Sequence, residues 1–461
     1  MVSKLKIDMV VLVCSNLLIG LLDFTFNLYC SEIYGPEGLG LMSLVGPVYC
    51  VFLSFITECI VITVSKMISR LNYYGNYEEM SATAKVATLA NLLWGTFVAF
   101  VMFASAGLIA QFFLKDINLA FPIRATCPLT ILMSVSNVLK GYFLGRNKIK
   151  IPAFINMAEK LFRFPVLYLL IKLFLNQTAF HPISLVYFCY SIGEALRVLL
   201  LLLYAKLSNP CHTRKVLGRK ENPAKAGVGS GVRFNGSGKT PISSEFAKQT
   251  IKEIVRRAIP LCLTNCLLEF SGALCSVIVK SGLISIGFTY KHALASLGKF
   301  RGMVLPLMSY PMIIISSMVM IMVPRLSTII TTGNRDYARK LIIKVMGIAL
   351  FIGLVTGIIF LIYGDALGVA IYGRDDLGLM IKLSAILVPV MYMAATSNSI
   401  LISMGEEKIS FRNSLLQQII LLVSLRFFTA IKSINIYGYI IGMFICYVFQ
   451  FVINLKDIRS F

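Results

Sequence analysis

Long apolar segments separated by short polar ones run through all 461 residues of the chain. A helix that crosses a bilayer needs about 20 apolar residues, and windows of that length recur along the whole sequence. The pattern predicts twelve membrane-spanning helices, at residues 8–29, 41–64, 86–113, 119–144, 152–175, 183–205, 257–279, 303–323, 343–364, 378–403, 410–430 and 435–455. The expected fold class is therefore an all-α polytopic membrane protein, with two pseudo-symmetric six-helix bundles.

One polar segment divides the predicted spans into two groups of six. Residues 1–206 are predicted to form an N-terminal six-helix bundle. Residues 207–242 are rich in glycine, lysine and arginine, which cannot bury a core, and we predict a flexible basic cytoplasmic linker. Residues 243–461 are expected to begin with an amphipathic helix on the inner membrane surface and to continue into a C-terminal six-helix bundle.

The two halves repeat each other at a spacing of about 260 residues. Ser136-Asn137 in the first half is matched by Ser397-Asn398 in the second, and a glycine and then a lysine follow each pair. Duplicated polytopic proteins are typically transporters, because two similar bundles that rock about a midplane site give alternating access. The repeat predicts a membrane carrier, not an enzyme.

Composition supports a membrane protein and argues against a nucleic-acid partner. Apolar residues make up 57% of the chain and charged residues only 14%, with a mean hydropathy of +0.80. A soluble domain has about 25% charged residues. The net charge of +23 is explained by positive cytoplasmic loops next to anionic membrane lipids.

Lysine and arginine concentrate on alternate loops. The connection at residues 206–257 holds twelve of them. The opposite loops hold fewer, chiefly Lys115, Lys172, Lys280, Lys291, Arg374 and Lys432. Because this bias sets membrane orientation, both termini are expected to be cytoplasmic.

No motif predicts a cofactor, a metal site or a nucleotide site. The eleven cysteines have neither metal-ligand spacing nor a disulfide framework. Gly236-Ser237-Gly238-Lys239-Thr240 resembles the end of a phosphate-binding loop, but Arg233 occupies the position of its first glycine. We therefore expect transport to be driven by a gradient of H⁺ or Na⁺, or by the membrane potential.

Ionisable residues within predicted spans are the candidate site residues, because such residues are costly in a bilayer and usually face a cavity or a partner. Asp23, Glu58 and Glu269 are the candidates for a coupling ion. Asp23, with Asn27 one turn later, either holds a cation or lies in a wet vestibule. Glu58 and Glu269 either face a cavity, carry a proton or pair with an arginine.

Two further groups of charges have structural explanations. Glu194 and Arg197 are three residues apart on a predicted helix and are expected to neutralise each other. Lys160 and Arg163 lie near the inner end of the fifth span and are expected to extend toward the interface.

Five short segments carry a family resemblance: Tyr34-Gly35-Pro36-Glu37-Gly38-Leu39-Gly40-Leu41, Val64-Ser65-Lys66, Lys140-Gly141-Tyr142-Phe143-Leu144-Gly145, Ile192-Gly193-Glu194 and Gly302-Met303-Val304-Leu305-Pro306-Leu307. In this order they resemble segments of the stage V sporulation protein B family of polysaccharide transporters. That family belongs to the multidrug, oligosaccharidyl-lipid and polysaccharide exporter superfamily. Asn27 stands where family members generally carry an arginine.

The resemblance implies a cleft lined by spans one, two, seven and eight, and a flippase activity in the bacterial cytoplasmic membrane. The substrate would be a lipid-linked saccharide, such as a peptidoglycan precursor. Arg301, Lys299 and Lys140 are candidate donors to its pyrophosphate, with Asn27 and Glu58 also in the cleft.

Two alternatives stay open. The first is a cation-coupled multidrug exporter of the same fold. The second is a non-transporting scaffold that recruits cell-wall synthesis proteins through its basic loop. A positively charged cleft would favour the flippase, and a negatively charged cleft would favour the exporter.

Overall fold

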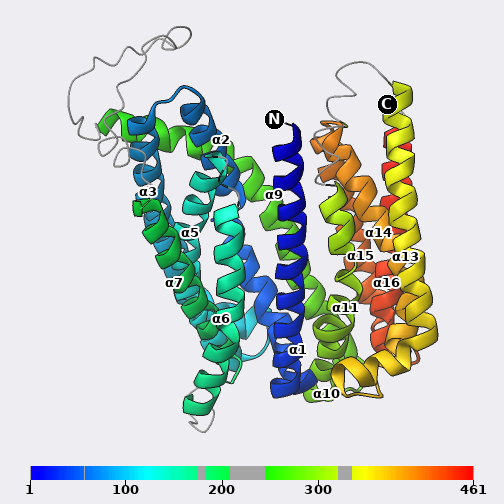
Figure 1. Cartoon of the computed structure of the whole chain (residues 1–461). Helices are drawn as coiled ribbons and strands as arrows, with labels where there is room; N and C mark the ends of the chain where they lie inside the picture. The colour runs from blue at the N-terminus through cyan, green and yellow to red at the C-terminus, as the bar shows by residue number, and fades with distance from the viewer. Residues whose placement is uncertain are drawn as a thin grey trace. The chain divides into compact units, whose positions relative to one another are not determined.

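The computed structural model describes residues 2–56, 58–146, 148, 150–174, 182–207, 244–319, 326 and 335–459. For some of these residues the structure describes the backbone alone: 2–14, 58–59, 244–249, 253, 255–261, 263–264 and 335. The elements described are all helical (Figure 1). The main helices are α1 (Val2–Ser54), α2 (Glu58–Tyr73), α3 (Tyr77–Leu108), α4 (Ala120–Ala125), α5 (Cys127–Gly145), α6 (Lys150–Phe174), α7 (Ser184–Leu207), α9 (Ser244–Ser285), α10 (Tyr290–Leu297), α11 (Leu305–Ser309), α13 (Arg335–Tyr372), α14 (Gly378–Ser403), α15 (Glu407–Phe428) and α16 (Gly438–Arg459).

The all-α fold class is confirmed, and every predicted span overlaps helical residues. Among the described residues, eight helices are long and apolar enough to cross a membrane, or nine if a bent pair counts as one span. That pair, Tyr290–Ser309 and Met312–Val319, bends by 49° and overlaps most of the predicted eighth span. The first predicted span and the first part of the second lie in the single element α1, while α6 and α15 carry several charged residues each.

The connection between the first two spans differs from the predicted loop. Helical structure continues through the whole of α1 and is broken only at Gly35, which has φ 63° and ψ −173°. Glycine reaches this backbone region without a steric penalty, and Pro36 suits the first turn of the helix that follows. The predicted second span is interrupted by a turn at Phe55–Ile56, after which α2 begins.

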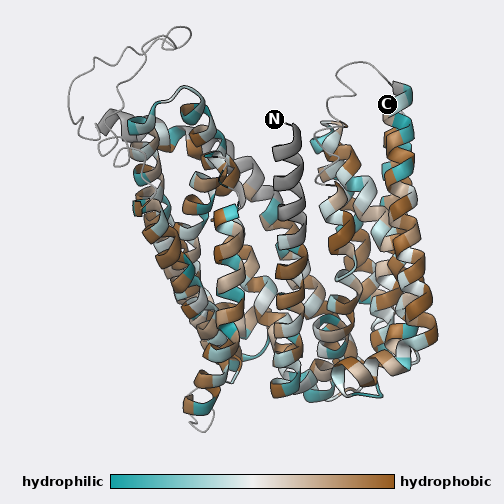
Figure 2. Ribbon diagram, viewed as in Figure 1, coloured by the Kyte–Doolittle hydropathy of each residue, from teal (hydrophilic) through white to brown (hydrophobic). Residues whose placement is uncertain are grey.

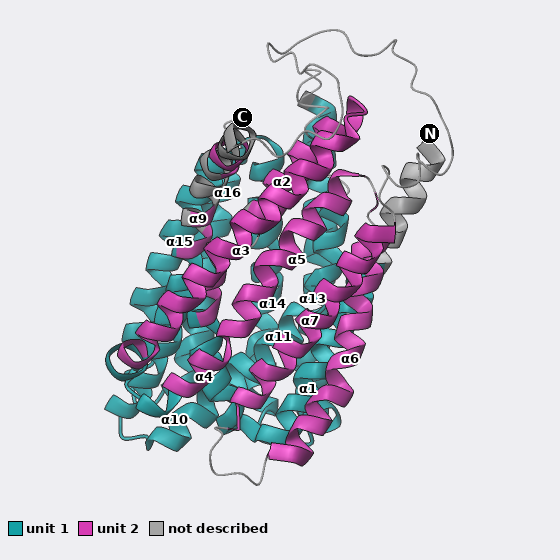
Figure 3. Ribbon diagram, turned by 90° about the vertical axis from the view of Figure 1, so that its left-hand side faces the viewer, with its two compact units in different colours: residues 1–48, 110–119, 267–461 teal, residues 49–109, 120–266 magenta. Residues whose placement is uncertain are grey.

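The chain forms two compact units (Figure 3). Unit 1 contains residues 1–48, 110–119 and 267–461, and unit 2 contains residues 49–109 and 120–266. Residues 1–48 and 110–119 therefore pack with the C-terminal helices. Almost all of the predicted linker at 207–242 lies outside the described residues, so the predicted division of the sequence at that segment stays a prediction.

Glycines allow close packing inside each unit. In unit 2, a Cβ atom at Gly141 of α5 would lie 2.9 Å from the Val61 carbonyl oxygen, and one at Gly145 would lie 2.7 Å from the Ser65 carbonyl oxygen. These glycines are four residues apart, a spacing that lets two helices approach closely in a membrane. In unit 1, Gly353 of α13 has the same role against α14.

Exposed apolar side chains cover the long helices. On α13, Ile343, Phe351, Ile358 and Ile362 are all exposed, and Figure 2 shows hydrophobic residues along most of this helix. On α3, Leu93, Phe97 and Phe100 are exposed in the same way. Large apolar surfaces of this extent are typical of helices that face lipid.

Candidate functional site

A short π-helix, η4 (Gly298–Val304), joins α10 to α11 in the first arm of the bent pair and carries two predicted site residues, Lys299 and Arg301. Two glycines four residues apart place it against α1. A Cβ atom at Gly298 would lie 2.6 Å from the Gly40 backbone nitrogen and would overlap the Pro36 carbonyl, and one at Gly302 would lie 2.7 Å from Leu39 Cβ. π-Helical turns are rare and frequently lie at functional sites.

Arg301 is held by neutral groups. Its Nη1 donates a hydrogen bond to the Gly272 carbonyl oxygen, at 3.0 Å, and another to the Ser276 hydroxyl. Ser276 is buried and donates in turn to the Ser43 carbonyl, at 2.8 Å, so that η4, α9 and α1 are joined. Among the described residues, no carboxylate pairs with this half-buried guanidinium. Arg301 therefore retains a net positive charge that the described part of the site does not neutralise.

Lys299 is different, because its charge is compensated. Its Nζ lies 2.7 Å from Asp376 Oδ2, and Arg374 forms a forked pair with the same carboxylate at 3.0 and 2.8 Å. Asp376 lies in the loop between α13 and α14. The hydrogen bond from Arg374, supported by Lys299, lowers the pKa of Asp376 to about 2. Lys299 thus ties η4 to a loop, and Arg301 is the better ligand candidate.

The first half of α1 runs along the broken span and brings Asp23 and Asn27 into unit 1. The rings of Phe24 and Tyr310 are 5.4 Å apart, and a Cβ atom at Gly20 would overlap Ile313. Asn27 is half-buried, and its Oδ1 atom has no hydrogen-bond partner among the described residues. Asp23 is exposed.

The predicted residues do not all belong to one unit. Glu269 is exposed on α9 in unit 1, on the same helix as the partners of Arg301. Lys140 is half-buried on α5, in unit 2. Glu58 is the first residue of α2, also in unit 2, and its side chain lies outside the description. Unit 1 thus holds five of the predicted residues: Asp23, Asn27, Glu269, Lys299 and Arg301.

Unit 2 has a charged core. Arg197 Nη2 lies 3.2 Å from Glu194 Oε1, which confirms the predicted neutralisation within α7. Ser136 of α5 donates a hydrogen bond to Glu194 and accepts one of 2.7 Å from Arg197. The Glu194 side chain is only 1% exposed, so this triad is enclosed between the helices of unit 2.

A second buried carboxylate lies on α6. Glu159 is fully buried and pairs with Arg163, whose guanidinium lies 4.6 Å from the ring centre of Tyr190. Arg163 is thus paired within unit 2, with its side chain 12% exposed, and its predicted extension toward the interface stays a prediction. A Cβ atom at Gly193 would lie 2.9 Å from Glu159 Oε1, so Gly193 provides space for the carboxylate. Glu159 Oε2 has no hydrogen-bond partner among the described residues.

Lys280 is a buried cation that sequence reasoning placed in an outer loop. That placement is wrong: α9 continues to Ser285, and Lys280 is 1% exposed. Its Nζ donates to the Leu114 carbonyl and lies 5.2 Å from the centre of the Tyr290 ring, while Tyr290 donates to Asp116. The apolar residues on both sides of Lys280 were the available signal that the helix continues through it.

Together, the long apolar helices, the broken span with its arginine and the buried charge pairs are those of a polytopic α-helical membrane protein. Comparisons with known proteins agree. The MatE family model matches residues 12–169. Stage V sporulation protein B of Bacillus subtilis (strain 168) is 19% identical over 407 residues, which cover 88% of this chain and 74% of that protein.

Solved structures show the same fold. An inward-facing multidrug resistance MATE family transporter of the MOP superfamily matches with a TM-score of 0.70 and 14% identity, covering 96% of this chain and 95% of the other. A second match is a MOP superfamily transporter from Pyrococcus furiosus, reported to have a binding pocket of reverse polarity that suggests a different function. It has a TM-score of 0.62 and 15% identity, and the match covers 98% of this chain and 95% of the other. The chain thus has the fold of MATE transporters of the MOP superfamily, and the resemblance to stage V sporulation protein B is confirmed.

Proposed function

We propose that this transporter is a flippase, which moves a lipid-linked saccharide across the bacterial cytoplasmic membrane by alternating access. Arg301 carries the proposal. A guanidinium that is half-buried in a broken span, and bound among the described residues to a carbonyl and a hydroxyl, suits the oxygens of a phosphate or pyrophosphate. Its neutral partners position the side chain without cancelling its charge.

The similarity to stage V sporulation protein B supports the same substrate class. Asn27 lies on α1, which packs along the broken span, and its unpartnered amide oxygen can accept a hydrogen bond from a sugar hydroxyl. We propose that Arg301 binds the headgroup phosphate and that Asn27 contributes to recognition of the saccharide. Lys140 remains a candidate from the other unit.

A transport assay tests this function. Purified protein in liposomes would receive an undecaprenyl pyrophosphate carrying a fluorescent saccharide, and the fraction accessible to an external quencher would be followed in time. Arg301→Ala is expected to slow transport at least about tenfold, since a charge-assisted hydrogen bond contributes about 1.5–3 kcal/mol. Arg301→Lys should retain part of the rate.

Arg374→Ala is the matched control, because it removes an arginine from the neighbouring charge group and leaves the Lys299–Asp376 pair in place. It should transport at nearly the rate of the unmodified protein. Thermal unfolding of each variant would separate lost transport from lost folding. An Arg301→Ala protein that is folded and transports normally would exclude Arg301 from substrate binding.

A cation-coupled multidrug exporter is the second candidate function. The buried carboxylates of unit 2 favour it, above all Glu159, whose Oε2 atom has no partner among the described residues. Asp23 and Glu269 are further candidates for the coupling ion. A pH gradient across the same liposomes should then drive uptake of a lipophilic cation such as ethidium, and Glu159→Gln should abolish the pH dependence. Movement of neither probe would favour the scaffold function.

We also propose that both termini face the cytoplasm. The alternating distribution of lysine and arginine supports this orientation. A single cysteine at Ser230, in the basic linker outside the described residues, should react with an impermeant maleimide only after cells are opened. Labelling of that cysteine in intact cells would reverse the proposed topology.

A further inference from the structure

Arg426 is a cation near the end of the long helix α15 and has no protein partner among the described residues. It lies in the last turn of α15, is exposed, and has no hydrogen bond or ion pair among the described residues. The other arginine of α15 contrasts with it. Arg412, near the opposite end, pairs with Asp457 at 2.9 Å and also donates to Asn413. On the same helix, Arg412 has protein partners, whereas Arg426 has none among the described residues.

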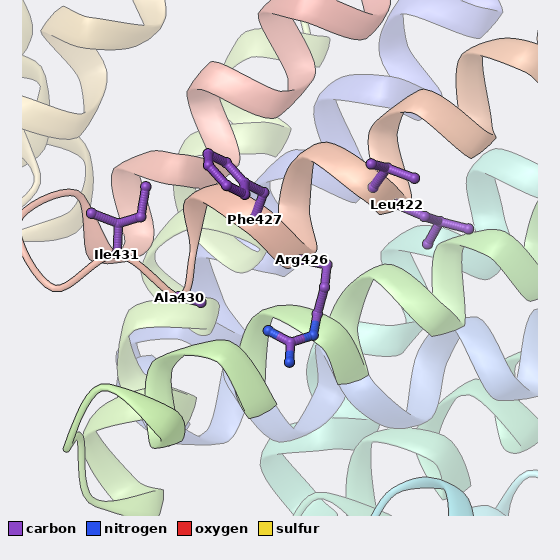
Figure 4. Close-up of a pocket in the computed structure, with 6 residues that line it drawn as sticks. Leu422, Arg426, Phe427, Ala430 and Ile431 are labelled. Atoms are coloured by element: carbon purple, nitrogen blue, oxygen red, sulfur yellow. The ribbon is translucent and has the colours of Figure 1, made fainter.

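Arg426 borders a pocket of about 690 Å³ whose other lining residues are all apolar: Leu422, Val423, Phe427, Ala430 and Ile431. These residues form two adjacent rows at a spacing of four, which places them on one face of α15 and on the turn that follows. In Figure 4 the guanidinium extends away from α15, while Leu422 and Phe427 lie along the helix. The pocket thus has one cationic group and an apolar wall.

The apolar wall continues along the helix beyond the pocket. Leu416, Ile419, Val423 and Phe427 are all exposed, the last two by 65% and 64%. At a rise of 1.5 Å per residue, this stripe is about 16 Å long. A stripe of that length on the surface of a helix can accommodate much of an acyl chain.

We propose that this surface binds one anionic phospholipid, with its phosphate on Arg426 and an acyl chain along the α15 stripe. Charge complementarity selects this occupant. An exposed guanidinium at the edge of an apolar surface is costly unless it reaches water or an anion, and a phosphate can accept both of its parallel N–H groups. The surface shares no residue with the Arg301 group, so it is independent of the proposed substrate site.

Favourable interaction with the helix dipole also accounts for a cation in the last turn of α15. That interaction requires no lipid and does not distinguish one headgroup from another. Preference for an anionic headgroup, lost with Arg426 and not with Arg412, is therefore the property that separates the two explanations.

Native mass spectrometry of the full-length protein in detergent tests the proposal. The probes are dioleoylphosphatidylglycerol, dioleoylphosphatidylcholine and free glycerol 3-phosphate, and the measurement is the apparent affinity of the first bound molecule. The unmodified protein should prefer the anionic lipid about tenfold over the zwitterionic one. Arg426→Gln should remove this preference, Arg426→Lys should retain part of it, and glycerol 3-phosphate should not bind at the same concentration.

Arg412→Gln is the matched control, since it removes the same charge from the same helix where Asp457 already neutralises it. It should leave the lipid preference unchanged. Phe427→Asn tests the apolar wall and should weaken binding of both lipids. Equal affinity for the two lipids in the unmodified protein, an unchanged preference in Arg426→Gln, or equally tight binding of glycerol 3-phosphate would each overturn the proposal. Size-exclusion profiles of the exposed-site variants should match that of the unmodified protein.

Discussion

Ser136 on α5 donates a hydrogen bond to Glu194 on α7. The equivalent residues of the second half, Ser397 on α14 and Asn454 on α16, are joined by a 3.0 Å hydrogen bond in which the asparagine donates. Two positions about 58 residues apart are therefore hydrogen-bonded in each half, as expected if the sequence repeat of about 260 residues is also a structural repeat.

The chemistry of this shared position has diverged. Glu194 pairs with Arg197 in the first half, whereas Asn454 accepts a 2.9 Å hydrogen bond from Asn413 in the second. Asn413 also donates to Asp457, which pairs with Arg412. The charged pair of the first half is buried, with side chains 1% and 11% exposed, whereas those of Arg412 and Asp457 are 55% and 18% exposed. The first-half group is therefore the one expected to be more sensitive to loss of charge.

Glu194→Gln should destabilise the protein by about 3 kcal/mol, because it leaves the largely buried Arg197 guanidinium without a compensating charge. Unfolding of purified protein in detergent would measure the loss. The double variant Glu194→Gln with Arg197→Gln removes both charges and should recover much of the stability. Equal destabilisation of the single and double variants would contradict a charge-pairing role.

Gly298→Ala should cost about 1–3 kcal/mol, because the new methyl group would meet the backbone of Pro36 and Gly40, which cannot move aside as a flexible side chain can. The matched control is Gly347→Ala in α13, where a Cβ atom has nothing within 4 Å. Alanine there should be neutral or slightly stabilising in the same thermal assay. Tolerance of alanine at both positions would show that η4 and α1 are less closely packed than the structure describes.

Lys280→Met should loosen the segment at residues 110–119, because it removes the donor to the Leu114 carbonyl and the cation on the Tyr290 ring. Methionine retains much of the apolar part of the lysine side chain, so any increase in exchange can be attributed to loss of the ammonium group. Hydrogen exchange measured by mass spectrometry should increase in peptides that cover this segment. Lys291→Met, at an exposed position on α10, should leave their exchange unchanged.

Asp376 should contribute stability that depends on pH. Its folded-state pKa, lowered to about 2 by Arg374 and Lys299, lies below the unfolded value of about 3.9. Its contribution is therefore present above about pH 4 and lost as the pH falls toward 2. Because the carboxylate is 35% exposed, solvent screening limits the effect to less than about 1 kcal/mol. The stability difference between the unmodified protein and Asp376→Asn should shrink over that window in thermal scans.

The sequence by itself determined the features that depend on spacing along the chain. Apolar windows of bilayer length predicted the helices, and the three-residue separation of Glu194 and Arg197 predicted their pairing, because a helix places such residues on one face. Resemblance in short segments, including Ile192-Gly193-Glu194, predicted the transporter class. The structure adds that Gly193 makes space for Glu159, a contact between α6 and α7.

Only the tertiary structure decided which distant groups meet. Arg301 obtains its hydrogen bonds from α9, Lys280 is buried against the segment that follows α3, and Arg426 has no partner among the described residues. Hydropathy assigns a lysine to a loop or a helix from its neighbours in sequence, but burial and pairing depend on which helices pack together. That packing is set by complementary shapes, such as Gly298 against Pro36, whose partners are far apart in the chain.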